Sequence, residues 1–214
     1  MTRRRIPLFP LPGVVLLPGT LLPLHIFEPR YRSMVADALD GERTIGMAML
    51  KPGWEEGTEP LPVHPLGGAG EIVESEELPD GRYNIVLEGR FRYRILEEAA
   101  ADPYRVAQVE EVPPVSFATA EETARVSLLA VQLFTEVSRS MELPPLPEGA
   151  LSPERLASEL AVRLRYTPEE LQQMLETDAL SSRFGALFER MIEWEKRMRF
   201  LAPFRPPDLD GNRN

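Results

Sequence analysis

The stretch that decides the fold is Ile6 to Tyr31, which reads IPLFPLPGVVLLPGTLLPLHIFEPRY. It consists of short apolar pieces separated by six prolines. Each proline removes a backbone donor and clashes with the preceding helical turn, so the stretch cannot form a continuous helix. No uninterrupted apolar run approaches the roughly 18 residues that a membrane span requires. The pattern therefore predicts short buried strands joined by tight turns at Pro12-Gly13 and Pro18-Gly19.

Three arginines, at positions 3 to 5, precede this stretch as the basic region of a leader peptide would. A leader normally has a continuous apolar core followed by a small-residue cleavage site, whereas this core is cut by prolines and runs into charged residues. The chain has no cysteine, which excludes disulfides and thiolate metal sites. We therefore expect a cytoplasmic protein that neither crosses nor binds a membrane.

The charge balance argues against nucleic-acid binding as the main activity. The 214 residues include 24 basic and 34 acidic side chains, for a formal net charge of −10. Non-specific nucleic-acid binding depends on basic side chains that neutralise phosphates. Neither half of the chain is a basic module, so we expect partners of another kind.

The sequence divides into a strand-rich part and a helical part. Residues 1–115 carry short, partly alternating apolar segments with Gly, Pro and Asp between them, together with one probable helix over 29–39. Residues 116–202 change to a helical period and predict a bundle of about four helices, and residues 203–214 look like a flexible tail. We expect an α+β fold in which a β-barrel or folded sheet precedes a helical bundle.

Start signals mark the helices of the second part. Thr119 and Glu122 have the spacing of a capping box, and Ser152 and Thr167 each precede a proline at a first helical position. A further helix is expected over about 178–201. After Thr119, one apolar stripe is predicted to face the bundle, formed by Ala124, Leu128, Val131, Phe134, Val137 and Met141.

Three segments resemble one known family. LFPLPGVVLLPGTLLPLHIFEPRYRSMV is similar to the start of the Lon protease N-terminal, substrate-binding domain family, and this block is the most specific. GRYNIVLEGRFRYRI and LASELAVRLRYTPEELQQMLETDALSSRF continue the similarity, so that it extends from Pro7 to Leu201. The resemblance implies a PUA-like β-barrel followed by a helical bundle, in a region that helps the full protease to capture unfolded or tagged proteins.

The catalytic parts of that protease have no counterpart in this sequence. No G-x-x-x-x-G-K-S/T phosphate loop is present, and neither lysine follows a glycine. A serine-lysine dyad needs a desolvated lysine beside the nucleophile, whereas Lys51 precedes a Pro-Gly turn and Lys196 lies in an amphipathic helix. We therefore expect a stand-alone, non-enzymatic module that binds proteins or peptides with exposed apolar segments.

Arg90, Arg92 and Arg94 alternate with apolar residues, so on a strand their guanidinium groups would share one face. One interpretation is an RNA-binding stripe, because PUA-like folds often bind RNA. The other is a solvated, ion-paired strand face, which the nearby glutamates and the acidic total favour. RNA binding is thus the alternative function, and Arg92 is the residue that tests it.

Two further regions supply candidate binding residues. Trp54 lies in the Pro- and Gly-rich segment 51–68 and is either an aromatic anchor for a peptide or a residue that folds back onto the barrel. In the last predicted helix a seven-residue repeat includes Met191, Trp194 and Met198. This stripe either packs into the domain's own bundle or forms a seam for a partner or a homodimer through residues 178–201.

No cofactor or metal ion is expected. The two histidines, His25 and His64, occur without cysteine and without an H-E-x-x-H motif, so a packed His25 and an exposed His64 are the favoured interpretations. The partners that remain are unfolded proteins or peptides, with a protease or a chaperone as the machine that would use them. The candidate binding residues are Trp54, Arg92, Met191, Trp194 and Met198.

Overall fold

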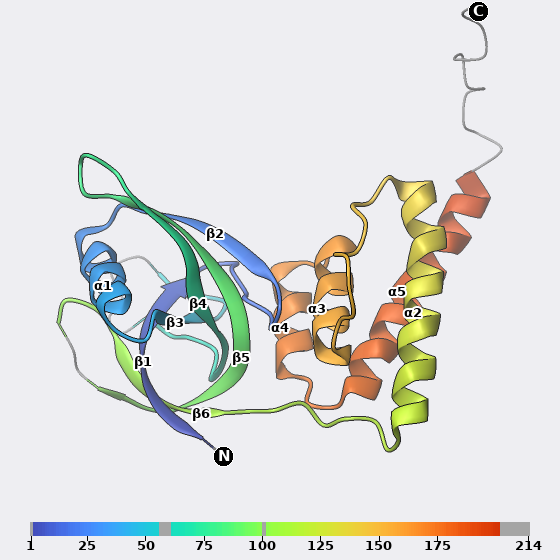
Figure 1. Ribbon diagram of the computed structural model, residues 1–214, viewed down its shortest axis with the longest axis horizontal. Helices are drawn as coiled ribbons and strands as arrows, with labels where there is room; N and C mark the ends of the chain where they lie inside the picture. Colours follow the sequence, from blue (N-terminus) through green and yellow to red (C-terminus); the bar gives the residue numbers. More distant parts are fainter. Residues whose placement is uncertain (1, 56–60, 100–101, 202–214) are drawn as a thin grey trace, which may run out of the picture.

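The structure, a computed structural model, describes residues 2–55, 61–99 and 102–201. A β-barrel occupies one end of the molecule and a bundle of helices the other (Figure 1). The order is β first and helices second, so the predicted α+β fold is confirmed. The predicted tail, residues 203–214, lies outside the described residues.

Six strands form one sheet in the order β2-β5-β4-β3-β1-β6, and β6 also pairs with β5, which closes a barrel. β1 and β3 are parallel, and the other pairs are antiparallel. The longest strand, β5, has 17 residues, and its register shifts against β4 and β6 mark bulges. The strands are β1 (Arg3–Leu11), β2 (Leu21–Ile26), β3 (Thr44–Met49), β4 (Leu66–Glu77), β5 (Tyr83–Ala99) and β6 (Val106–Glu111).

The loop between β1 and β2, residues 12–20, lies between the barrel and the bundle. Both predicted turns form, with positive φ angles of 64° and 82° at their glycines. Leu16 is buried in the barrel core, while its neighbour Leu17 is buried in the core of the helices. The loop approaches β4 so closely that a Cβ on Gly68 would lie 1.8 Å from the carbonyl oxygen of Leu16. The proline-cut opening therefore joins the two halves of the fold, in addition to building the first strands.

One helix, α1 (Pro29–Asp40), covers the barrel, as predicted over 29–39. Its buried side chains are apolar and include Met34 and Val35, which join the barrel core. Tyr31 in its first turn lies against Phe9 of β1, with ring centroids 4.3 Å apart. This apolar contact fixes the helix on the barrel.

Four helices form the bundle: α2 (Ala120–Met141), α3 (Pro153–Arg163), α4 (Pro168–Glu176) and α5 (Leu180–Leu201). Their start signals are as expected, since Thr119, Ser152 and Thr167 each accept a hydrogen bond from a backbone N–H of the first turn. The reciprocal capping box forms at Thr167, where Glu170 bonds back to the Thr167 N–H. Of the two bonds of a capping box at Thr119, the structure describes only the one from the N–H of Glu122 to the threonine hydroxyl.

The two predicted helical stripes have different outcomes. The repeat in α5 packs into the bundle's own core, where Phe184, Leu187 and Met191 are fully buried. In α2 the predicted stripe is wrong over its first half, because Leu128 and Val131 are exposed to solvent. The buried face of α2 runs instead through Ala130, Phe134 and Val137. The predicted stripe therefore coincides with the buried face only at Phe134 and Val137.

Tyr93 of β5 is buried in the barrel, and its hydroxyl donates a hydrogen bond to the carbonyl oxygen of Met47 at 2.9 Å. Burial raises the pKa of this phenol well above its usual value of 10. The unfolded chain ionises Tyr93 near pH 10, while the folded chain keeps it neutral. The stability that Tyr93 contributes is therefore present below about pH 10 and is lost as the pH rises above that value.

We predict that Tyr93→Phe lowers the free energy of unfolding by about 1–2 kcal/mol near pH 7, because the Met47 carbonyl loses its donor. We also predict that the difference from the wild type shrinks at about pH 11, since the phenylalanine has no proton to release. Urea unfolding at the two pH values measures both effects. A difference that stays constant or grows with pH would contradict this assignment.

Candidate functional site

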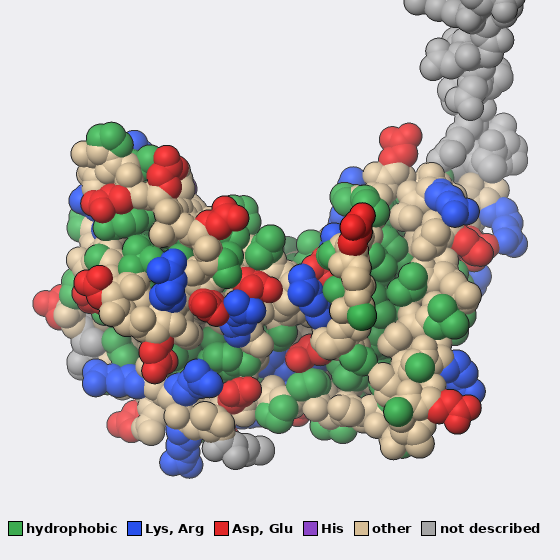
Figure 2. All heavy atoms as spheres, viewed as in Figure 1, with side chains coloured by type: hydrophobic (Ala, Val, Ile, Leu, Met, Phe, Trp, Pro, Cys, Tyr) green, Lys and Arg blue, Asp and Glu red, His purple; other side chains and the backbone are tan. Residues whose placement is uncertain are grey.

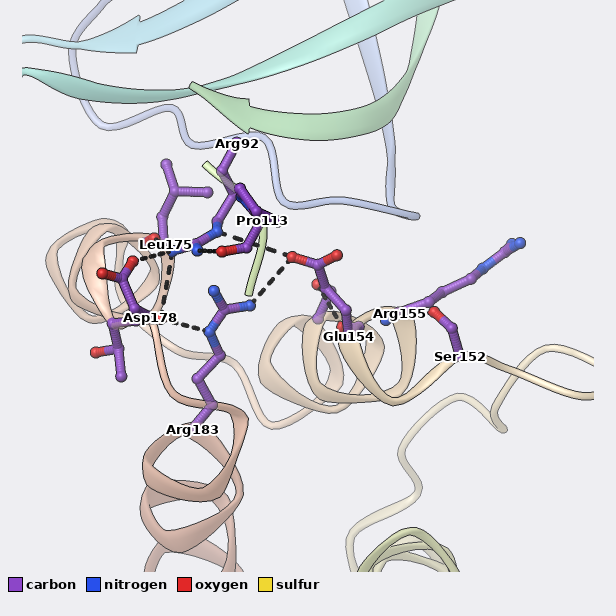
Figure 3. Close-up of polar contacts among 10 residues, drawn as sticks. Arg92, Pro113, Ser152, Glu154, Arg155, Leu175, Asp178 and Arg183 are labelled. Atoms are coloured by element: carbon purple, nitrogen blue, oxygen red, sulfur yellow. Dashed lines mark hydrogen bonds and ion pairs between the residues drawn. The ribbon is translucent and has the colours of Figure 1, made fainter. Parts of the chain in front are cut away.

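Arg92 of β5 does not face solvent; its side chain crosses from the barrel into the bundle and is 0% exposed (Figure 3). Its neighbour Tyr93 points the other way, into the barrel core, so β5 is covered on both faces at this point. The guanidinium donates to the carbonyl oxygens of Leu175 (2.7 Å), Thr177 (3.3 Å) and Pro113 (3.1 Å) and to the Asp178 carboxylate (3.1 Å). These acceptors lie at the end of α4, in the turn that follows it, and in the segment leading to α2.

A second arginine, Arg183 of α5, lies beside this cluster and is only 3% exposed. Glu154 of α3 stands between the two guanidinium groups, 3.8 Å from Arg92 Nε and 3.4 Å from Arg183 Nη1 (Figure 3). Burial, followed by the positive charge of Arg92, lowers the pKa of Arg183 to about 10. Both arginines are charged at neutral pH, and Glu154 and Asp178 balance them.

This arginine cluster (Arg92, Arg183, Glu154 and Asp178) links β5 with α3, the α4–α5 turn and α5. The expectation of a solvated, ion-paired face is therefore wrong for Arg92. It holds for Arg90, which pairs with Glu71 and Glu88 on the surface. Strand alternation placed these arginines on one face, but it could not show that the bundle covers that face at Arg92. The stripe proposed for RNA thus lacks its central guanidinium at the surface.

We predict that Arg92→Met lowers the free energy of unfolding by about 2–4 kcal/mol, because a carboxylate and several carbonyl oxygens at the interface lose their hydrogen-bond donor. The half-exposed Asp178 keeps the loss below that of a fully buried pair. Arg90→Met, which removes only surface ion pairs, serves as the control and should cost about 1 kcal/mol or less. Urea unfolding of both variants provides the measurement, and equal losses would refute the structural role of Arg92.

Trp194 and Met198, two of the predicted binding residues, line a groove between α2 and α5 with a volume of about 320 Å³. They are one helical turn apart on α5 and face Val137 and Ser140 of α2. Both helices extend past α3 and α4 at this end of the bundle (Figure 1), and among the described residues those that line the groove come from α2 and α5. The α2–α5 groove is therefore a half-open depression in which Trp194 and Met198 lie among polar and charged side chains.

Charged side chains border this groove. Glu136 lies on the α2 side, and Glu195 pairs with Arg199 at 2.6 Å along the α5 side. Figure 2 shows hydrophobic side chains scattered among charged ones over the helical end of the molecule. An apolar floor with a charged rim resembles the anatomy of a protein-binding surface, where apolar anchors carry the affinity and rim charges add specificity.

The other predicted binding residues are not part of the groove. Met191 is fully buried in the helical core, so it cannot contact a partner in this conformation. Trp54 lies in the segment after β3 and is 36% exposed. It is distant in sequence from the groove, and it shares no described pocket with Trp194 or Met198.

The sheet edges are poorly suited to binding by strand addition. The Gly89 N–H donates to the Thr20 carbonyl, so in the register of β2 on β5 the backbone groups of Leu21, Pro23 and His25 point away from the sheet. Pro23 has no N–H to offer at this free edge. The outer end of β4 carries exposed glutamates at positions 74, 76 and 77. Proline and charge of this kind protect edges from pairing, which leaves the groove as the better candidate site.

Neither histidine suggests a metal site. His25 is exposed and bonds to Asn84 at 2.8 Å, while His64 is partly buried and pairs with Glu176 at 2.9 Å. The expected burial of the two histidines is thus reversed, because His25 lies on the outward face of an edge strand. Among the described residues, no group of three or more potential ligands is placed to hold a metal ion.

Comparison with known proteins identifies the family. The family model described as the ATP-dependent protease La (LON) substrate-binding domain matches residues 5–193. The chain is 29% identical over 189 residues to a Lon protease of Anaeromyxobacter dehalogenans, an alignment that covers 86% of this chain and 22% of that protein. A Lon protease of Roseiflexus castenholzii is 31% identical over 177 residues, with 80% and 22% covered. This chain belongs to the Lon substrate-binding domain family.

Solved structures agree on the fold. The N-terminal domain of a Mycobacterium avium complex Lon protease superposes with a TM-score of 0.66 at 19% identity, covering 88% of this chain and 98% of that one. A Lon N-terminal domain protein from Xanthomonas campestris gives 0.63 at 21% identity, with 87% and 98% covered. The chain spans less than a quarter of the length of the Lon proteases it matches. Within the described part of the chain, no helix has the length and apolarity to cross a membrane.

Proposed function

We propose that this chain binds proteins through their exposed apolar segments and that the α2–α5 groove is where such a segment docks. Membership of a substrate-binding domain family supports the general activity. The observation that carries the location is the pair of partly exposed apolar side chains, Trp194 and Met198, which line the groove above the buried Val137. Large aromatic side chains dominate the energy of many protein interfaces, and methionine adapts to apolar partners of different shape.

The groove suits a short apolar segment better than a whole folded surface. Its volume of about 320 Å³ accommodates one or two large side chains. The rim glutamates and Arg199 would contact the polar backbone or flanking residues of the same segment. Apolar side chains become accessible in unfolded proteins, so this geometry favours unfolded chains over native ones.

We further propose that the chain captures proteins without processing them. Its sequence has no phosphate loop to supply energy from a nucleotide. Its curated relatives are Lon proteases. By analogy, a protease or a chaperone would act on what this chain holds, and the chain would serve as an adaptor.

We predict that Met198→Glu weakens binding of an unfolded probe by about tenfold, because it places a charge where the apolar segment would lie. The probe is a reduced, carboxymethylated and fluorescently labelled globular protein, and its anisotropy is measured against chain concentration. The same probe in its native, disulfide-bonded form should bind weakly or not at all.

Ile192→Glu is the matched control, since Ile192 lies on the same helix, is exposed and is not part of the groove. It should leave the affinity within about twofold. Loss of binding in Ile192→Glu alone, or retention in Met198→Glu, would refute the groove as the docking place. Loss in Trp54→Ala alone would assign binding to the segment after β3.

A further inference from the structure

Helix α2 carries an apolar face that the bundle does not cover. Leu128 is 59% exposed and Leu129 is 52% exposed, and both lie in the middle of this helix of 22 residues. In Figure 1, α2 lies at the end of the molecule opposite the barrel, with its outer side turned away from the remaining elements. Two exposed leucines do not define an interaction site by themselves, because single exposed apolar residues are common on protein surfaces; the arrangement of the charges around them is the second observation.

Charged residues flank these leucines on the same side of α2. At 3.6 residues per turn, residues that lie on one line along the helix surface are spaced by whole turns. Glu121 and Arg139 are five turns apart and lie on about the same line as Leu128. Arg125 and Glu136 are three turns apart and lie on the neighbouring line. All four charged side chains are exposed. Within the described part of the chain, none of the four has an ion-pair partner within 4.0 Å. Their charges are therefore available to a molecule that packs against this face.

The order of these charges has a symmetry that the helix dipole does not explain. A glutamate in the first turn and an arginine in the last turn are what the dipole favours, so Glu121 and Arg139 need no further reason. The inner two run in the opposite order, with Arg125 towards the N-terminus and Glu136 towards the C-terminus. Each pair has its midpoint next to Ala130, about 14 Å from the outer charges and about 8 Å from the inner ones.

We propose that this face of α2 binds the same face of a second copy of the chain, with the two helices antiparallel. A two-fold axis perpendicular to the helix, at the level of Ala130, relates the two copies. Glu121 then lies opposite Arg139 of the copy, and Arg125 lies opposite Glu136 of the copy. Leu128 then meets the middle of the partner helix, near Gln132. Such an isologous pair presents four opposite-charge contacts around an apolar centre.

A second copy fits this surface better than an unrelated segment does. In a parallel pair every charge would face its own equivalent, so the charge order selects the antiparallel arrangement. The first part of the repeat in α5 packs into the bundle's own core, at Phe184, Leu187 and Met191, whereas this face of α2 is not covered by the bundle. The predicted homodimer thus moves from residues 178–201 to α2. One helix pair is a small interface, so the dimer is weak and forms only at high concentration.

This inference does not depend on the proposed binding of unfolded proteins, although Glu136 borders the groove and also belongs to the inner charge pair. The floor of the groove is contributed mainly by Trp194 and Met198 of α5, which the α2 pair does not use. A chain that dimerises without binding an unfolded probe would refute only the proposed function. A chain that binds the probe as a strict monomer would refute only the dimer.

Charge reversal on α2 tests the proposal. Arg125→Glu places two glutamates against each other at both ends of the pair, and sedimentation equilibrium should show a dissociation constant raised by about tenfold or more. Glu136→Arg alone should have the same effect. The double variant with both changes restores opposite charges and should return the dissociation constant to within about threefold of the wild type.

The restored pairing in the double variant cannot be produced by a folding defect, so it distinguishes recognition from stability. Leu128→Glu should abolish the dimer, whereas Leu21→Glu, at an equally exposed leucine of β2, should leave it unchanged. A wild-type chain that stays monomeric at millimolar concentration would overturn the proposal. So would single and double charge variants with the same dissociation constant, or a different protein that occupies this face while the chain remains monomeric.

The absence of native cysteine allows a direct test of orientation. In the antiparallel pair, residue 132 lies close to its equivalent, while the two copies of residue 124 are about 18 Å apart along the axis. Under oxidation, Gln132→Cys should therefore form a covalent dimer far faster than Ala124→Cys. Equal rates of cross-linking for the two variants would overturn the antiparallel arrangement.

Discussion

The interaction on which the rest of the structure depends is the insertion of the Arg92 guanidinium of β5 into the helical bundle. The bundle could pack against the barrel in several ways through apolar contacts alone, because such contacts have no direction. The planar Arg92 guanidinium, whose acceptors include three carbonyl oxygens and one carboxylate, permits far fewer arrangements of the bundle on the barrel. Arg183 and Glu154 extend this constraint to α5 and α3, so α5, which lines one side of the groove, is positioned from the barrel.

The proline-cut opening supplies the apolar half of the same junction. Its loop between β1 and β2 places Leu16 in one core and Leu17 in the other, and it lies directly on Gly68 of β4. The arginine cluster makes the polar contacts between barrel and bundle, and this loop makes apolar contacts beside them. Together they leave the far end of the bundle free of the barrel. That end is where α2 and α5 extend beyond the other helices (Figure 1) and where Trp194 and Met198 line the groove.

Local signals in the sequence were sufficient for most of the fold. Prolines and glycines located the first strands, and hydroxyl caps at Thr119, Ser152 and Thr167 located three helix starts, since these effects act within a few residues. Contacts between distant segments were harder. Alternation put Arg92 on a strand face without revealing what covers it. The helical period placed Leu128 and Val131 on the buried face of α2, whereas both are exposed. Trp194 and Met198 could be predicted as binding residues because the seven-residue repeat continues beyond the part of α5 that packs into the core.

The central claim is that an apolar segment docks between α2 and α5, and Trp194 reports on it directly. The chain has two tryptophans, so in a Trp54→Phe variant all tryptophan fluorescence comes from Trp194. Titration with the reduced and carboxymethylated protein, prepared without its own tryptophans, should shift this emission to shorter wavelength in a saturable manner. The half-saturation point should match the affinity from anisotropy. Binding by anisotropy with unchanged Trp194 emission would contradict the account.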